Sequence, residues 1–225
     1  MIDFHSHILP NIDDGCENIQ ESIQLLNILE NEGVDKLCLT PHFYPDYEDI
    51  DTFINRRNNS YNQLINTYKG NIKLLLGSEV RYYTGISTNP NINKLTLQDT
   101  NLLLLELPFD INIQEYIIKE IINLSKNQNL RVVLAHIERY NIDDNTLKNL
   151  KNVGILIQAN TESFIHIFKN KKPIHRIKNE LIDFIGSDTH NTTTRLPNYQ
   201  KAIQTLSKHI DINLFNERME AMIHE

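Results

Sequence analysis

The sequence has no tryptophan and only two cysteines, Cys16 and Cys38. We attribute the missing tryptophan to genome composition. Two cysteines cannot form a disulfide framework, and this low number indicates a reducing compartment. We therefore expect a cytoplasmic protein.

The sequence also shows no long apolar run, no pattern of a signal peptide and no cluster of basic residues. No apolar stretch approaches the roughly 20 residues that cross a membrane. The start lacks the basic and apolar regions of a signal peptide, since Asp3 and His5 come too early. The net charge is -7 and no run of lysine or arginine occurs, which argues against a protein that reads a nucleic-acid backbone. We expect no membrane insertion and no nucleic-acid partner.

Short apolar runs alternate with polar segments of helical periodicity. The predicted strands cover residues 1–7, 36–42, 72–80, 102–109, 131–140, 154–160 and 182–190. The predicted helices cover residues 17–32, 49–68, 113–127, 143–151, 171–180, 197–208 and 211–223.

Nearly continuous apolar strands are typical of a parallel sheet that is covered on both faces. The chain shows no internal repeat and no linker, and 225 residues suit one large domain. We predict a single domain over residues 1–225, with a closed or nearly closed α/β barrel. A doubly wound open sheet is the alternative, although no glycine-rich phosphate turn follows any predicted strand.

Histidines and carboxylates stand at the ends of six of the seven predicted strands. They are His5 and His7, His42, Glu79, Glu106, His136, and Asp188 with His190. The other four histidines, His166, His175, His209 and His224, fall in predicted helices or loops. Residues two apart on a strand share a face, so His5 and His7 leave the first strand side by side. The carboxyl ends of barrel strands are where active sites form, and Asp14 on the first loop can join them.

Each residue alone has a structural alternative. Glu106 could be a salt-bridged barrel carboxylate, His42 a loop histidine, and Asp188 a helix cap. We interpret Asp13 as a turn or cap residue. The coincidence at six strand ends favours metal binding for the set as a whole.

The nine candidate ligands are imidazoles and carboxylates, with no thiolate. Mixed nitrogen and oxygen donors suit Mn, Fe or Zn, and the lack of cysteine disfavours a closed structural zinc site. Nine ligands exceed the needs of one ion and imply two or three, with a carboxylate bridging a pair. Ions paired about 3.5–4 Å apart support in-line attack on phosphorus. Their charge would outweigh the four carboxylates, which favours an anionic substrate.

Two arginines follow the candidate ligands on the chain. Arg139 lies three residues beyond His136, and Arg195 lies five beyond His190. An arginine fork can hold two phosphate oxygens at once. For each one, an ordinary surface arginine is the alternative.

The segments HSHILPNIDDG, TPH, GSEV, LELPF, AHIERY and SDTHN with a following arginine resemble the polymerase-and-histidinol-phosphatase (PHP) superfamily. Within it, the chain resembles the manganese-dependent tyrosine-protein phosphatases of bacterial capsule and exopolysaccharide operons, from residue 1 to about 197. The resemblance implies a distorted (β/α)7 TIM-like barrel that holds three divalent ions, with Mn favoured.

The ligand sets follow from this resemblance, residue by residue. They are His5, His7, Glu79 and Asp188 for one ion, Glu79 as a bridge with Glu106 and His136 for the second, and Asp14, His42 and His190 for the third. Asp14 and Glu106 favour the tyrosine-phosphatase branch, because the histidinol-phosphatase branch tends to have histidines there. Ile137 departs from the proline that the family usually has, which concerns the loop and not the ligands.

Our first hypothesis is an enzyme that hydrolyses phosphotyrosine in proteins, with Arg139 and Arg195 as catalytic residues that hold the phosphoryl oxygens. By resemblance, the partner would be the tail of an autophosphorylating tyrosine kinase that controls polysaccharide export. Phe43, Tyr44 and Tyr47 could form a wall for an aromatic ring, although we interpret them as loop packing.

Two other hypotheses stay open. One is a PHP phosphatase of a small metabolite such as histidinol phosphate, and the other is a non-catalytic metal-binding module. A cysteine-dependent tyrosine phosphatase is excluded. It needs an arginine six residues after its nucleophile, and this chain has Ser22 and Tyr44 at those positions.

Overall fold

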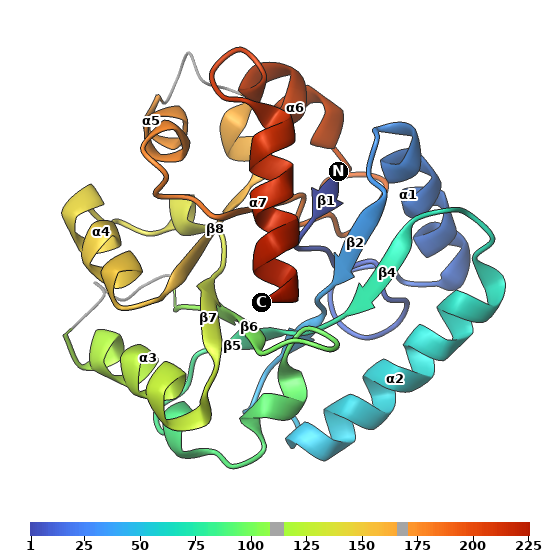
Figure 1. Cartoon of the computed structure of the whole chain (residues 1–225). Helices are drawn as coiled ribbons and strands as arrows, with labels where there is room; N and C mark the ends of the chain where they lie inside the picture. The colour runs from blue at the N-terminus through green and yellow to red at the C-terminus, as the bar shows by residue number, and fades with distance from the viewer. Residues whose placement is uncertain (109–114, 166–170) are drawn as a thin grey trace.

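The structure is a computed structural model that describes residues 1–108, 115–165 and 171–225 (Figure 1). The last residue of the predicted strand 102–109, the first two residues of the predicted helix 113–127, and His166 lie outside the described residues.

The described strands are short, and all their pairings are parallel. They are β1 (Ile2–Asp3), β2 (Lys36–Leu39), β3 (His42–Phe43), β4 (Lys73–Leu76), β5 (Glu79–Arg81), β6 (Leu102–Glu106), β7 (Arg131–Leu134), β8 (Leu156–Asn160) and β9 (Phe184–Gly186). Their spatial order is β1-β2-β4 in one sheet and β3-β5-β6-β7-β8-β9 in the other.

Two predicted strands each divide into a pair of short strands. Residues 36–42 become β2 and β3, because Pro41 has no N–H to donate and restricts the preceding residue. Residues 72–80 become β4 and β5. The backbone ladder continues across both breaks, since Gly77 N donates to Leu39 O at 2.8 Å and Glu79 N donates to Pro41 O at 3.0 Å. The barrel wall is therefore continuous there.

The wall closes between its first and last strands. Phe4 N donates to Ile185 O at 3.1 Å, and Asp188 N donates to His5 O at 2.8 Å. Ser6 and Thr189 form a further parallel bridge. The curled parallel sheet thus confirms the predicted distorted α/β barrel and not the open doubly wound sheet.

The predicted helices are confirmed, and every end that falls on described residues lies within two residues of its expected position. They are α1 (Ile19–Asn31), α2 (Ile50–Thr67), α3 (Glu115–Gln128), α4 (Asp144–Asn152), α5 (Lys172–Lys178), α6 (Tyr199–Leu206) and α7 (Ile212–His224). Asn18, Asp49, Asp143 and Asp211 cap their helices by accepting backbone N–H groups of the first turn. Between β5 and β6 the chain forms the 3-10 helices η1 (Ile86–Thr88) and η2 (Ile92–Leu95) in place of an α-helix.

Four predicted strands are too long at their carboxyl ends. The first ends at Asp3, the fourth at Glu106, the fifth at Leu134 and the seventh at Gly186. His136 has φ 33° and Asp188 has φ 53°, in the left-handed region that interrupts a β-ladder. Both are candidate ligands, so the β-strand conformation ends where the candidate site begins.

Helix α7 covers the amino ends of several strands and lies in front of the barrel in Figure 1. Asn216 Oδ1 accepts from Ile2 N at 3.0 Å, Glu220 pairs with Lys36, and Met222 O accepts from Arg131. No helix among the described residues is long and apolar enough to span a membrane.

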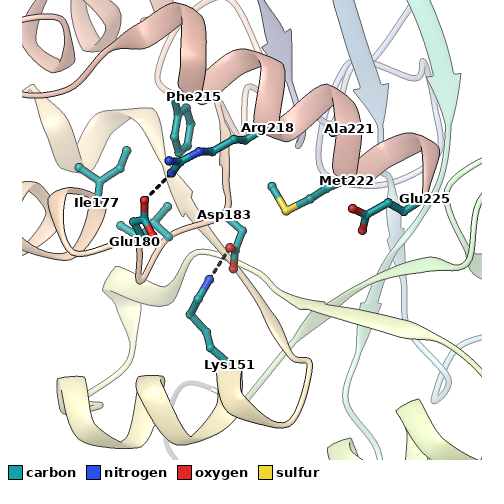
Figure 2. A pocket seen from close by; sticks show the side chains of 10 residues that line it. Lys151, Ile177, Glu180, Asp183, Phe215, Arg218, Ala221, Met222 and Glu225 are labelled. Atoms are coloured by element: carbon teal, nitrogen blue, oxygen red, sulfur yellow. Dashed lines mark hydrogen bonds and ion pairs between the residues drawn. The ribbon is translucent and has the colours of Figure 1, made fainter.

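A pocket of about 370 Å³ lies beside α7 (Figure 2). Lys151 pairs with Asp183, and Arg218 Nη1 pairs with Glu180 Oε1 at 2.6 Å. Asp183 immediately precedes β9, so this pocket belongs to the amino end of the barrel. It is therefore separate from the strand ends that carry the candidate ligands.

Candidate metal centre

The nine candidate ligands converge at the carboxyl end of the barrel. Those at strand ends lie in or just after β1, β3, β5, β6, β7 and β9, and Asp14 lies on the loop before α1. Parallel strands bring their carboxyl ends to one edge, which explains how residues up to 185 positions apart in the sequence meet.

A first group surrounds one oxygen of Glu79. Nε2 of His5 and Nε2 of His7 each lie 3.1 Å from Glu79 Oε2, and the two nitrogens lie 3.0 Å apart. Asp188 Oδ1 lies 3.4 Å from His7 Nε2 and 3.7 Å from His5 Nε2. The two imidazoles therefore lie side by side, as the sequence predicts, although β1 itself ends at Asp3.

A second group uses the other oxygen of Glu79. His136 Nε2 lies 2.8 Å from Glu79 Oε1 and 3.5 Å from Glu106 Oε1. Glu79 thus stands between this group and the first, where a bridging carboxylate would be needed. His42 also approaches it, with Nδ1 3.0 Å from Glu79 Oε2.

A third group forms around Asp14. Its Oδ1 lies 3.4 Å from His190 Nε2 and 3.7 Å from His42 Nε2. His7 also lies close enough to supply a nitrogen to this group. The Asp14 side chain is 64% exposed, whereas the other eight candidate ligands are buried. The centre therefore opens toward solvent at Asp14.

The atoms of the first two groups fit a divalent cation. Among the described residues, the buried Glu79 Oε2 and His42 Nδ1 have no hydrogen-bond partner, although they lie 3.0 Å apart. Buried polar atoms are nearly always satisfied, so these two call for a partner that the side chains do not provide. Nitrogen and oxygen donors converging on one point match the preferences of Mn, Fe and Zn. The residues present therefore fit the metal ions.

Four histidines are oriented through their second ring nitrogen. His7 Nδ1 lies 2.6 Å from Asp13 Oδ2, and His190 Nδ1 lies 2.9 Å from the backbone oxygen of Asp188. His5 Nδ1 lies 3.4 Å from Gln158 Oε1, and His136 Nδ1 lies 3.3 Å from the Tyr140 hydroxyl. Such contacts are typical of metal-binding histidines, whose tautomer and ring orientation they fix.

Asp13 has more partners than the sequence suggested. Its Oδ1 accepts from Gly15 N at 3.0 Å, as expected of a turn residue. Its Oδ2 contacts His7 and also accepts from His42 N at 2.8 Å. A Cβ on Gly15 would lie 2.0 Å from His7 O, so only glycine fits this turn. Asp13 thus closes the turn and orients His7, whereas its neighbour Asp14 is a candidate ligand.

Gln158 and Asn160 of β8 are functional candidates that the sequence analysis missed. Gln158 Oε1 accepts from His136 N at 2.6 Å, and Asn160 Nδ2 donates to Asp188 Oδ2 at 2.8 Å. The sixth predicted strand, β8, supplies no candidate ligand, but its two amides contact three of them, His5, His136 and Asp188. In the sequence, the polar Gln158 and Asn160 stand out in the otherwise apolar run GILIQAN, and this could have indicated their role.

The departure at Ile137 leaves the local geometry intact. Ile137 is buried and begins η3 (Ile137–Arg139). A proline also fits the first position of a helical turn, where its missing N–H is not needed. His136 precedes this turn and reaches Glu79.

Charges in the centre lower the pKa of Asp188 and raise the pKa values of His136 and His7. Burial would raise the pKa of Asp188, but His5 and His7 outweigh it and hold this pKa well below its usual range. Burial likewise opposes protonation of His136, yet hydrogen bonds with Glu106 and Glu79 raise its pKa to about 9. Asp13 raises the pKa of buried His7 well above its ordinary value, again against the effect of burial. Metal ions and protons would therefore compete for these nitrogens.

The two arginines meet at one carboxylate. Arg195 Nη2 lies 2.6 Å from Asp188 Oδ2, and Arg139 Nη2 donates to the same oxygen. Arg195 Nη1 also lies 2.6 Å from His190 Nε2. Both side chains are about a third exposed and line a pocket of about 280 Å³ next to the centre. The structure thus brings Arg139 and Arg195 to the edge of the candidate centre.

Neither cysteine supplies a candidate ligand, although Cys16 Sγ donates to the backbone oxygen of His190 at 3.6 Å. Both are buried and unpaired. Burial raises the pKa of the Cys16 thiol to about 12 and that of Cys38 well above its ordinary value. A thiolate nucleophile is disfavoured at both positions, in agreement with the spacing argument.

The structure confirms the distorted parallel barrel that the resemblance to the PHP superfamily implies, with histidines and carboxylates clustered at its strand ends. A solved histidinol phosphate phosphatase from Lactococcus lactis shares the fold, with a TM-score of 0.56 at 16% identity over 96% of this chain and 93% of that chain.

The chain belongs to the family described as capsular polysaccharide synthesis, CpsB/CapC, whose model matches residues 1–221. It is 30% identical over 216 residues to the tyrosine-protein phosphatase YwqE of Bacillus subtilis, covering 92% of this chain and 84% of YwqE. A solved structure from work on YwqE and on CpsB of Streptococcus pneumoniae, described as metal-dependent tyrosine phosphatases, aligns with a TM-score of 0.82. That alignment has 27% identity and covers 98% of this chain and 92% of the other.

Proposed function

We propose that this chain is a metal-dependent phosphomonoesterase that hydrolyses phosphotyrosine in protein substrates. The observation that carries the proposal is the convergence of nine histidines and carboxylates with two arginines at one end of the barrel. The names of the family relatives support the same activity. A non-catalytic module would not need this full set.

Three divalent ions would occupy the centre, with Mn favoured and Fe or Zn possible. The first site would use His5, His7, Glu79 and Asp188, the second Glu79, Glu106 and His136, and the third Asp14, His42 and His190. When bound, such ions neutralise phosphate charge and make water a stronger nucleophile at neutral pH.

The protein's own contribution is to bind and orient the phosphoryl group. Arg139 and Arg195 stand side by side on Asp188 Oδ2, so both guanidinium groups can turn toward phosphoryl oxygens at the centre. A tyrosine phenolate leaves with a pKa of about 10 and needs less proton donation than an alkoxide. The site therefore suits an aryl ester without a dedicated general acid.

The physiological partner that we propose is the tail of an autophosphorylating tyrosine kinase in capsule or exopolysaccharide regulation. The match to the capsular polysaccharide synthesis family supports this context. A cytoplasmic location agrees with two buried, unpaired cysteines.

The test is hydrolysis of p-nitrophenyl phosphate, a phosphotyrosine peptide and histidinol phosphate, with and without Mn²⁺. We expect Mn-dependent turnover of the peptide that is lost in His136→Ala. Faster turnover of histidinol phosphate than of the peptide would instead assign a metabolite phosphatase. A metal-loaded protein that cleaves none of the three would contradict catalysis.

A further inference from the structure

Tyr44 and Tyr47 form an aromatic rim beside the candidate centre. The Tyr44 ring stacks on the His42 ring, with centroids 4.8 Å apart and an interplanar angle of 28°. The Arg81 guanidinium lies 5.6 Å from the Tyr44 centroid. Tyr47 meets Tyr44 edge-on at 5.7 Å and is 84% exposed. Tyr44 is therefore held in place, while its neighbour presents an open aromatic surface.

Phe43 differs from these two tyrosines. It is 2% exposed and packs on Phe53, with ring centroids 5.2 Å apart. Loop packing thus accounts for Phe43. It does not account for Tyr47, whose ring is left in solvent, or for a tyrosine stacked on a candidate ligand.

The Tyr44 ring lies at the edge of the centre. It stacks on the candidate ligand His42, whose Nδ1 lies 3.0 Å from Glu79 Oε2. The ring therefore stands next to the place where a phosphoryl group would bind.

Asp14, the exposed candidate ligand, has an arginine and the aromatic rim near it. Arg195 Nη1 lies 3.8 Å from Asp14 Oδ2, and Tyr44 stacks on His42, whose Nε2 lies 3.7 Å from Asp14 Oδ1. A phosphate ester with an aromatic leaving group would contact both the arginine and the rim, whereas an alkyl ester would leave the rim uncovered.

We infer that Tyr44, supported by Tyr47, is the surface on which the phenyl ring of an aryl phosphate packs, and that it sets the preference for phosphotyrosine over phosphoserine. This inference rests on the proposed function, since it concerns the same centre. The binding free energy of an aromatic pair of this kind corresponds to roughly a threefold to tenfold preference for phosphotyrosine. The hydroxyl of Tyr44 has no part in this preference.

The experiment compares kcat/KM for two peptides that differ only in phosphotyrosine or phosphoserine. Tyr44→Ala lowers the value for the phosphotyrosine peptide about threefold to tenfold and leaves the phosphoserine value unchanged, while Tyr44→Phe behaves as the wild type. Inhibition constants for phenylphosphonate and methylphosphonate give a readout that needs no turnover. Tyr44→Ala weakens inhibition by phenylphosphonate alone.

Leu196→Ala is the matched control, because Leu196 is 45% exposed and lines the pocket beside Arg195. The inference is overturned if Tyr44→Ala affects both peptides equally, if Tyr44→Phe is as damaging as Tyr44→Ala, or if Leu196→Ala carries the selective loss. Failure of the proposed function looks different: the wild-type protein hydrolyses neither peptide. The phosphonate comparison then still decides whether Tyr44 selects an aryl group.

Discussion

Asp13 Oδ2 lies 2.6 Å from Nδ1 of His7 and turns the opposite nitrogen of that ring toward Glu79. The Asp13 carboxylate therefore orients a candidate ligand and is not itself one of the nine. We predict that Asp13→Asn weakens Mn²⁺ binding about tenfold and Asp13→Ala up to about 100-fold, because contacts of this kind fix ligand orientation and basicity. Competition against a fluorescent chelator measures the affinity. Asp46→Asn, an exposed aspartate on the loop before α2, serves as the control.

The two arginines give a second prediction. Arg195→Lys lowers kcat for the phosphotyrosine peptide about 100-fold, because a lysine cannot replace the two-pronged contact of a guanidinium with phosphoryl oxygens. Arg139→Lys has an effect of similar size. Steady-state kinetics measures kcat for both variants. Arg218→Lys, at an exposed arginine, is the control. Unchanged kcat in both variants would mean that the arginines only pair with Asp188.

The raised pKa of His136 predicts how the stability of the metal-free protein depends on pH. Its pKa is about 9 in the folded chain and about 6.5 in an unfolded chain, so the folded state binds this proton more tightly. The stabilisation is complete below pH 6.5 and is lost as the pH rises to 9. It amounts to about 3 kcal/mol in the free energy of unfolding. His7 acts in the same direction, because its pKa is also raised.

Urea denaturation of the chelator-treated protein between pH 6 and 9.5 measures this loss. His136→Gln makes the curve shallower, whereas His175→Gln, exposed on α5, leaves it unchanged. The pKa values of His42 and His190 are lowered, so they act below pH 6.5 and do not enter this window. A wild-type curve that is flat from pH 6.5 to 9 would contradict the assigned protonation.

Metal binding should also stabilise the fold. An ion that binds only the folded chain adds about 2.7 kcal/mol at a concentration 100 times its Kd. Glu79→Gln removes most of this gain, because Glu79 contacts His5, His7, His42 and His136. Thermal unfolding with and without Mn²⁺ measures the effect. Equal shifts in Tm for the wild type and Glu79→Gln would place the ions elsewhere.

The strand and helix pattern could be predicted from the sequence because apolar runs and capping residues are local signals. Asp49 and Asp143, for example, mark helix starts that the structure confirms. The strand ends could not be predicted in the same way. His136 and Asp188 adopt left-handed backbone conformations that depend on the surrounding structure, and no sequence pattern encodes them.

The candidate ligands could be found because each follows an apolar strand, and a parallel barrel gathers such positions at one end. The orienting residues were harder to find. Gln158 contacts His136 from the neighbouring strand β8, and Tyr140 contacts it from one turn along the chain. Their side chains are common in structural roles, so only the folded arrangement distinguishes them.

The first measurement to make is a titration of the metal-free protein with Mn²⁺, in which bound metal and turnover of the phosphotyrosine peptide are followed on the same samples. We predict three ions per chain at saturation, and turnover that appears only as the sites fill. Saturation at three ions without turnover of the peptide would contradict the phosphatase. Full turnover in the absence of bound metal would contradict the metal centre.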